Sequence, residues 1–117
     1  MKTRRAASNY RRLMVEIFYR YRVHPSQARA FEHAYGSTGP WTLLFKKHPG
    51  YRRTRLFRHG TQAGIYLTID VWDDKASWDE FRRIFLGDYQ RLDKQLALLH
   101  LEEHLLGFYD GTQEPYP

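Results

Sequence analysis

The sequence predicts an α+β protein with the ferredoxin-like order of elements, strand, helix, strand, strand, helix, strand (βαββαβ). Two observations favour this class. Residues 13–23 alternate apolar and polar side chains as a strand does, and the runs 51–58 and 65–72 flank a loop with two glycines, as in a β-hairpin. The segments between and after these strands carry apolar side chains at helical spacing. We therefore expect one antiparallel sheet with helices on one face.

The first half of the chain contains the first strand and two helical segments. In residues 13–23 one side of the strand carries the apolar set Val15, Ile17, Tyr19, Tyr21 and Val23. A helix is then expected over residues 25–35 and ends at Gly36. After the loop "GSTGP", a short helical segment holds Trp41, Leu44 and Phe45 and stops at Pro49-Gly50.

The second half begins with the hairpin and continues into a longer helical region. From Asp74 onward Trp78, Phe81 and Phe85 share one helical face, and Ser77 and Glu80 are spaced as a capping box. Gly87 is expected to break the helix, and a further segment places Tyr89, Leu92, Leu96 and Leu99 on one side. Residues 104–111 predict a closing strand.

Composition indicates one soluble domain with a charged arm. Residues 13–111 are expected to form a single domain, with residues 1–12 as a flexible basic arm and residues 112–117 as a tail. Of 19 basic residues, five precede the first acidic one, so the rest of the chain is nearly neutral against its 13 acids. This location of charge argues against nucleic-acid binding. Cysteine is absent and no apolar run is long enough for a membrane span, which favours a cytoplasmic protein without disulfides.

The third strand predicts a partner subunit. Ile65, Leu67, Ile69 and Val71 lie on one of its sides, and Tyr66, Thr68, Asp70 and Trp72 on the other. One layer of helices can cover only one of these sides. A second copy packing sheet against sheet would cover the other side, so we expect a homodimer that forms a dimeric α/β barrel.

Two blocks of sequence carry a resemblance to a known family. The segments "FEHAYGSTGPWTLLFKKHPGY" (31–51) and "YLTIDVWDDKASWDEF" (66–81) resemble the antibiotic-biosynthesis-monooxygenase family of dimeric α/β barrels. The resemblance extends over residues 13–110. It implies a fold shared by cofactor-free quinone-forming monooxygenases, haem-degrading enzymes and small proteins of unknown activity, so the fold does not fix the function.

The resemblance also implies a pocket between the sheet and the helices. In the cofactor-free monooxygenases this pocket is lined by a strand-end tryptophan, an asparagine four residues before it and a tyrosine six after it. Those positions are Trp72, Thr68 and Trp78 here, so only the tryptophan is kept. The axial histidine of the haem-degrading relatives has no counterpart, because no histidine lies between His59 and His100. We therefore expect no cofactor.

The residues themselves indicate a candidate site around Asp70 and Trp72, which are the proposed catalytic residues. A carboxylate on a largely buried face needs a partner or a shifted pKa, and the candidate partners are Arg20, His33 and Tyr35. A structural ion pair is the alternative to a catalytic base. Trp72 and Trp78 either form a pocket wall or belong to the core. The candidate substrate-binding residues are Tyr66, Thr68, Trp78, Phe18, Arg20, His33 and Tyr35.

Two further motifs do not support a function. The string "HLEEH" (100–104) has the H-x-x-E-H spacing of inverted zinc peptidases, but only 13 residues follow it and His104 is expected to enter the last strand. We interpret it as coincidence and expect no metal. The βαββαβ order also occurs in RNA-recognition modules, yet the third strand lacks their basic residue and spaced phenylalanines.

Two functional hypotheses remain. The first is an enzyme that oxidises a hydrophobic aromatic small molecule with oxygen and without a tightly held metal. The second is a non-catalytic, small-molecule-binding or stress-associated dimer that keeps the fold.

Overall fold

A computed structural model of the chain describes residues 13–112. The predicted basic arm (1–12) and all but the first residue of the predicted tail lie outside the described residues. The strands are β1 (Val15–Arg22), β2 (Tyr51–Arg58), β3 (Ile65–Trp72) and β4 (Glu102–Asp110), and they form one antiparallel sheet in the order β2-β3-β1-β4. The predicted α+β, ferredoxin-like class is confirmed.

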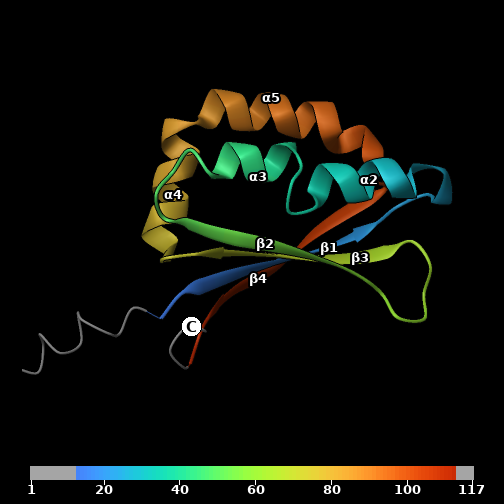
Figure 1. The fold of residues 1–117 in the computed structure, drawn as a ribbon, viewed down its shortest axis with the longest axis horizontal. Coiled ribbons are helices and arrows are strands. Elements are labelled where there is room, and N and C mark those ends of the chain that lie inside the picture. Colours follow the sequence, from blue (N-terminus) through green and yellow to red (C-terminus); the bar gives the residue numbers. More distant parts are fainter. Residues whose placement is uncertain (1–12, 113–117) are drawn as a thin grey trace, which may run out of the picture.

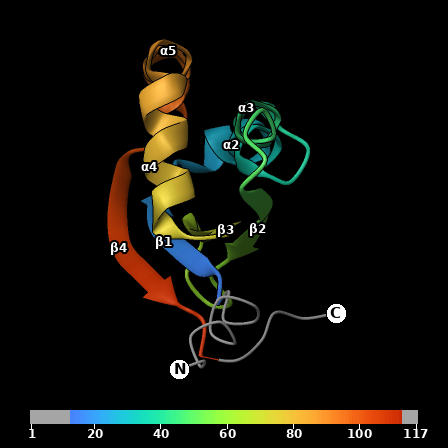
Figure 2. The same ribbon diagram turned by 90° about the vertical axis from the view of Figure 1, so that its left-hand side faces the viewer.

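The helices lie on one face of the sheet (Figure 1). They are α2 (Ala28–Tyr35), α3 (Pro40–Phe45), α4 (Lys75–Ile84) and α5 (Leu86–Leu96), with short 3-10 turns at Pro25–Gln27 and Ala97–Leu99. In the end view, α4 and α5 stand over the side of the sheet that holds β4, whereas α2 and α3 stand over the side that holds β2 (Figure 2). The site lies between these two pairs and the sheet.

Aromatic side chains fill most of the space between the sheet and the helices. Phe31, Trp72 and Phe81 are among the largest side chains that are fully buried. Alternation along β1 directs Ile17 and Tyr21 into this core, as the sequence predicts. Burial of such rings is the main favourable term in folding, because each removes a large apolar area from water.

The predicted hairpin is confirmed in position, and the structure gives its register. Thr54 on β2 faces Asp70 on β3, and Leu56 faces Thr68. The pairing contains an irregularity between Tyr51 and Arg53. Because facing residues share one side of the sheet, this register brings Thr54 and Asp70 together on the side covered by helices.

Three local predictions need correction. Asp74, and not Ser77, caps α4, because its side chain accepts a hydrogen bond from the Ser77 backbone N–H at 2.8 Å. The break between α4 and α5 falls at Phe85, two residues before Gly87, which lies inside α5. The last strand begins at Glu102 and contains a bulge opposite Phe18 and Tyr19.

Candidate functional site

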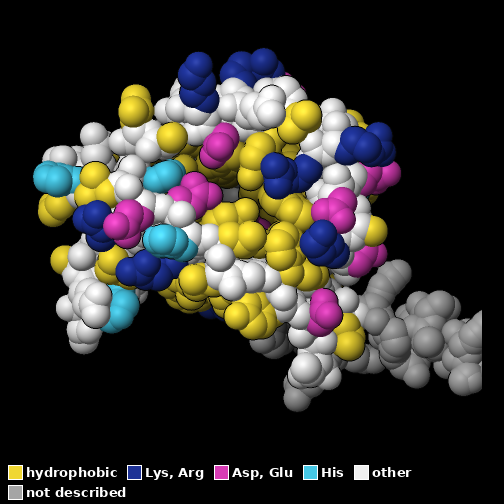
Figure 3. All heavy atoms as spheres, turned by 180° about the vertical axis from the view of Figure 1, so that it is seen from behind, with side chains coloured by type: hydrophobic (Ala, Val, Ile, Leu, Met, Phe, Trp, Pro, Cys, Tyr) yellow, Lys and Arg dark blue, Asp and Glu magenta, His cyan; other side chains and the backbone are white. Residues whose placement is uncertain are grey.

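A pocket lies between the sheet and the two helix pairs. It is lined from all four strands and from α2, α3, α4 and α5, by Tyr19, Tyr21, Tyr35, Trp41, Phe45, Thr54, Thr68, Asp70, Trp78, Tyr89, Asp93 and Glu103. Its volume is about 30 Å³, room for about two water molecules. The back of the molecule is hollowed, with hydrophobic side chains around the hollow and acidic ones beside it (Figure 3).

Asp70 is the most unusual side chain of the pocket. It is 6% exposed, and its Oδ1 accepts a hydrogen bond from the Thr54 hydroxyl at 2.6 Å. The Thr54 oxygen in turn accepts a hydrogen bond from the Tyr51 hydroxyl at 2.8 Å. Asp70 therefore ends a chain of two hydroxyl groups, and its partner is neutral. The prediction that Asp70 forms an ion pair with Arg20 is therefore wrong, and so is the prediction that its partner is His33 or Tyr35.

Burial without a cation changes the acidity of Asp70. Loss of hydration raises the pKa of the Asp70 carboxyl from 3.8 to about 7, although the Thr54 hydrogen bond acts in the opposite direction. Near neutral pH both the acid and its conjugate base are therefore populated. A carboxyl with these properties can accept a proton and return it.

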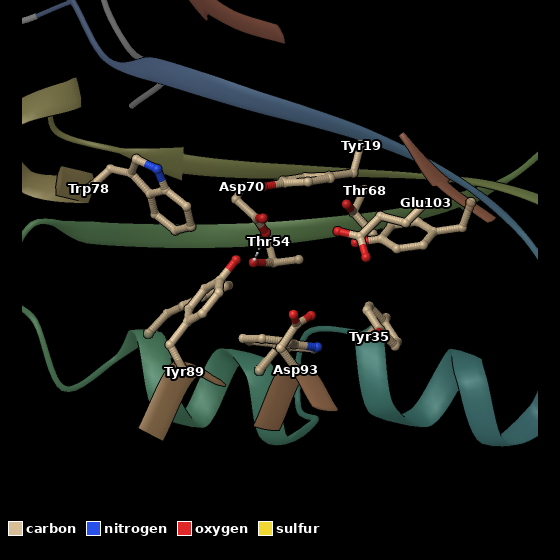
Figure 4. A pocket seen from close by; sticks show the side chains of 12 residues that line it. Tyr19, Tyr35, Thr54, Thr68, Asp70, Trp78, Tyr89, Asp93 and Glu103 are labelled. Carbon is tan, nitrogen blue, oxygen red and sulfur yellow. Dashed lines mark hydrogen bonds between the residues drawn. The ribbon is translucent and has the colours of Figure 1, made fainter. Parts of the chain in front are cut away.

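Tyrosine hydroxyl groups surround the carboxyl. Burial raises the pKa of Tyr19 and Tyr35 beyond the ordinary range of a phenol, and raises the pKa of Tyr89. These hydroxyls stay protonated at neutral pH and can donate hydrogen bonds. Figure 4 shows them around Thr54, Thr68 and Asp70 on the sheet. The site combines one buried base with several neutral donors.

Two further carboxylates line the pocket from opposite sides. Asp93 on α5 and Glu103 on β4 point toward one another across it (Figure 4). Burial, and then the charge of Asp93, raise the pKa of Glu103. Asp93 and Glu103 are both exposed to solvent. They therefore lie where the pocket meets water.

Four of the predicted site residues line the pocket together. They are Tyr35, Thr68, Asp70 and Trp78. Alternation places Thr68 and Asp70 on one face of β3, and the first turn of α4 places Trp78 beside the end of that strand.

Trp72 lies behind the pocket wall and does not line it. Its side chain is 0% exposed, and its ring packs edge-on against Trp78 at a centroid distance of 5.4 Å. Phe45, Phe81 and His48 also pack against it. Of the two alternatives for these tryptophans, the pocket wall holds for Trp78 and the core for Trp72, so the expected place of Trp72 in the site is wrong.

The remaining predicted residues lie elsewhere. Phe18 and Arg20 are on the face of the sheet away from the helices, where Phe18 packs on Tyr109 with ring centroids 5.1 Å apart. His33 is exposed on α2. Tyr66 is buried, but its hydroxyl donates to Glu32 at 2.6 Å, outside the pocket. Strand alternation alone already separates Phe18 and Arg20 from Asp70.

The sequence reasoning missed several pocket residues. The periodicity of the sequence places Tyr19 and Tyr89 on apolar faces, and it does not indicate that their hydroxyls reach the pocket. Thr54 could have been found from the hairpin register, since it faces Asp70. Asp93 follows Tyr89 by one helical turn, which was a usable signal. Glu103 could not be found, because its orientation depends on the bulge in β4.

The described residues show no arrangement suited to a metal ion. Across residues 13–112, no three His, Asp or Glu side chains are grouped as such a site requires. His100 precedes β4, with its Nε2 at 3.4 Å from Glu103 Oε1, whereas His104 lies within the strand and is exposed. Over the same residues, no helix has the length and apolar character needed to cross a membrane.

The fold and pocket define a small ferredoxin-like α+β protein with an aromatic, acidic cavity between sheet and helices. The chain belongs to the antibiotic biosynthesis monooxygenase family, whose sequence model matches residues 14–83. No curated protein sequence matches it.

Solved structures show the same fold at low identity. SnoaB from Streptomyces nogalater, a cofactor-independent oxygenase, is 21% identical with a TM-score of 0.62, over 86% of this chain and 95% of that one. A Bordetella bronchiseptica protein named for the same family is 16% identical with a TM-score of 0.67, over 86% and 99%. A conserved Methanosarcina mazei protein is 14% identical with a TM-score of 0.64, over 86% and 95%.

Proposed function

We propose that this protein is a cofactor-independent oxygenase of a hydrophobic aromatic small molecule, with Asp70 as the base. The observation that carries the proposal is a buried carboxyl with a pKa of about 7 and no cationic partner, inside an aromatic pocket. Such a group can remove a weakly acidic proton near neutral pH. The family membership and the description of SnoaB as a cofactor-independent oxygenase support oxygen as the second substrate.

The chemistry can be written for an activated methylene group. The Asp70 carboxylate takes one proton, and the resulting carbanion is delocalised over the aromatic system. Addition of O₂ gives a hydroperoxide, which loses its second C–H proton and hydroxide to form a carbonyl group. The balance is one CH₂ and one O₂ converted to one C=O and one water. Hydroxyls of Tyr19, Tyr35 or Thr68 would donate to the developing oxyanion.

The pocket must open to accept a ring system, because about 30 Å³ holds no aromatic ring. Tyr89 on α5 is half-buried, so moving it costs less burial than moving Trp78 or Tyr35. Trp78 and Tyr35 would then form the walls against which a planar substrate stacks. Trp72 would hold Trp78 in position from behind.

The small cavity also favours a second candidate function. The amide and the phenol that the resemblance implies at Thr68 and Trp78 are absent, and a cavity of about 30 Å³ holds no aromatic substrate without rearrangement, which suits a protein that keeps the fold without the reaction. A non-catalytic, stress-associated dimer with this fold is therefore the alternative.

Oxygen consumption with anthrone as the probe separates the two candidates. We expect Asp70→Asn to lower kcat/KM by about 10²–10⁴-fold, the usual contribution of a general base. In the unmodified protein kcat/KM should rise with pH through an apparent pKa near 7. Asp79→Asn is the control, because Asp79 is exposed on α4 and pairs with Lys75. A rate of oxygen consumption that does not depend on the protein favours the non-catalytic alternative. A protein-dependent rate that is unchanged in Asp70→Asn would instead show that Asp70 is not the base.

A further inference from the structure

The charged side chains that line the pocket are all acidic. Its lining includes Asp70, Asp93 and Glu103 but no lysine, arginine or histidine. Among the described residues, Asp70 has a hydroxyl as its partner, and no basic side chain forms an ion pair with Asp93. A ligand with a negative charge would meet repulsion from Asp93 and Glu103, and also from Asp70 when that carboxyl is ionised.

The histidine beside Glu103 does not neutralise this charge. The His100 side chain is 10% exposed, and its Nε2 lies 3.4 Å from Glu103 Oε1. The two atoms are not aligned for a hydrogen bond, and Nε2 has no other partner among the described residues. Burial lowers the pKa of His100, although the charge of Asp93 acts in the opposite direction. The ring is therefore neutral at physiological pH, and Asp93 and Glu103 face each other without a cation.

The aromatic rings of the pocket wall also favour the binding of an organic cation. Tyr35, Trp41, Trp78 and Tyr89 line the pocket, and aromatic faces attract ammonium groups. The protein already shows this contact at the pocket edge, because the Arg82 guanidinium lies 4.4 Å from the ring centre of Tyr89 and 5.6 Å from that of Trp78. Arg82 itself is exposed on α4 and is not part of the lining.

A poorly satisfied donor also lies in the pocket wall. The Trp41 side chain lines the pocket at 8% exposure, and its indole N–H meets the Tyr35 hydroxyl without good alignment. Buried donors in native proteins normally have a well-placed acceptor. A phenolic or carbonyl oxygen on a bound ring system could therefore compete with the Tyr35 hydroxyl for this N–H.

We propose that the molecule bound in this pocket is an aromatic compound with a protonated amine, held with its ammonium group between Asp93 and Glu103 and its ring toward Asp70. An ammonium group has about the size of a water molecule, so the cavity of about 30 Å³ that Asp93 and Glu103 line has room for one. The assignment of this amine as a substrate rests on the proposed function, whereas its binding does not.

Three probes that share a 4-hydroxyphenylethyl group and differ in its end group test the charge preference. Tyramine carries the ammonium group, 4-ethylphenol replaces it with hydrogen, and 3-(4-hydroxyphenyl)propionate replaces it with a carboxylate. Calorimetric titration at low salt should show tyramine binding at least about tenfold tighter than 4-ethylphenol. The carboxylate should not bind, and added salt should weaken tyramine binding.

Variants locate the ammonium site. Asp93→Asn and Glu103→Gln should each lower the affinity for tyramine by about 3- to 10-fold and leave 4-ethylphenol unchanged. Asp88→Asn is the matched control on α5, because it removes the same charge from a residue paired with Arg91 and Lys47 outside the pocket. Circular dichroism of each variant confirms that it is folded.

Three outcomes would overturn the proposal. Equal affinities for tyramine and 4-ethylphenol, no saturable tyramine binding at millimolar concentration, or a preference that survives in both variants would show that the carboxylates do not select an ammonium group. Failure of the proposed function looks different. In that case tyramine binds as expected, but no probe supports Asp70-dependent oxygen consumption.

Discussion

At the scale of single residues, Asp70 decides most of the chemistry. A carboxyl of ordinary acidity would be ionised at neutral pH and would need a cation when buried. Asp70 instead has one hydroxyl donor, and its pKa rises to about 7. At about 1.36 kcal/mol for each pKa unit, the shift from 3.8 means that ionised Asp70 lowers the folding stability by up to about 4 kcal/mol. A cost of this size is typical of functional sites.

The pH dependence of stability follows from this shift. Since the folded state holds the Asp70 proton more tightly than the unfolded state, the Asp70 contribution to the free energy of unfolding is complete below pH 3.8. It falls as pH rises toward about 7 and is lost above it. Asp70→Asn should remove this decline and be more stable than the unmodified protein at pH 8, as measured by urea unfolding at several pH values.

The control for this experiment is Asp79→Asn, whose carboxylate is exposed beside Lys75. Its stability should follow the pH profile of the unmodified protein, because exposed pairs contribute little. If the free energy of unfolding of Asp70→Asn and of the unmodified protein changed with pH in parallel, Asp70 would be ionised and hydrated and would not lie in a closed pocket.

At the scale of elements, the β2–β3 hairpin brings Thr54 to Asp70. Its loop closes at Gly64, which has a φ of +83° and whose carbonyl accepts a hydrogen bond from the Val23 N–H at 2.8 Å. A Cβ at Gly64 would lie 2.7 Å from the Val23 carbonyl oxygen. Only glycine combines this backbone conformation with so close an approach.

Two glycines of this loop provide a matched pair. Gly64→Ala should lower the free energy of unfolding by about 1–3 kcal/mol, because alanine is strained at this φ and meets Val23. Gly60→Ala should change it by no more than about 0.5 kcal/mol, since no atom lies within 4 Å of its added Cβ. Chemical denaturation measures both, and equal effects would show that the loop does not fix the hairpin.

At the scale of the whole molecule, no helix within residues 13–112 lies over the second face of the sheet (Figure 2). Phe18, Phe57, Leu67 and Ile69 lie half-buried on this face. Such an apolar surface favours association with another copy, as the third strand suggested. A homodimer remains a prediction.

Sedimentation at micromolar concentration should report about twice 14.1 kDa. Leu67→Glu should shift the protein to a monomer, because a charge in the centre of this face cannot be buried between two copies. Leu98→Glu is the control, since Leu98 is 85% exposed beyond α5. A monomeric unmodified protein, or a dimer that tolerates Leu67→Glu, would contradict sheet-to-sheet association.

The sequence by itself determined the class of fold, the hairpin and the core face of β1. These depend on periodicity and turn residues, which are local properties. It also identified Asp70, Thr68 and Trp78 as neighbours, because strand alternation and a strand-to-helix junction bring them together.

Only the tertiary structure decided which side chains form the cavity and which fill the core. Trp72 and Trp78 look equivalent in the sequence, yet packing of α4 on β3 buries one behind the other. The bulge in β4 directs Glu103 toward Asp93 on a distant helix. Burial and charge proximity arise from contacts between segments far apart in the chain, so local patterns carry no information on them.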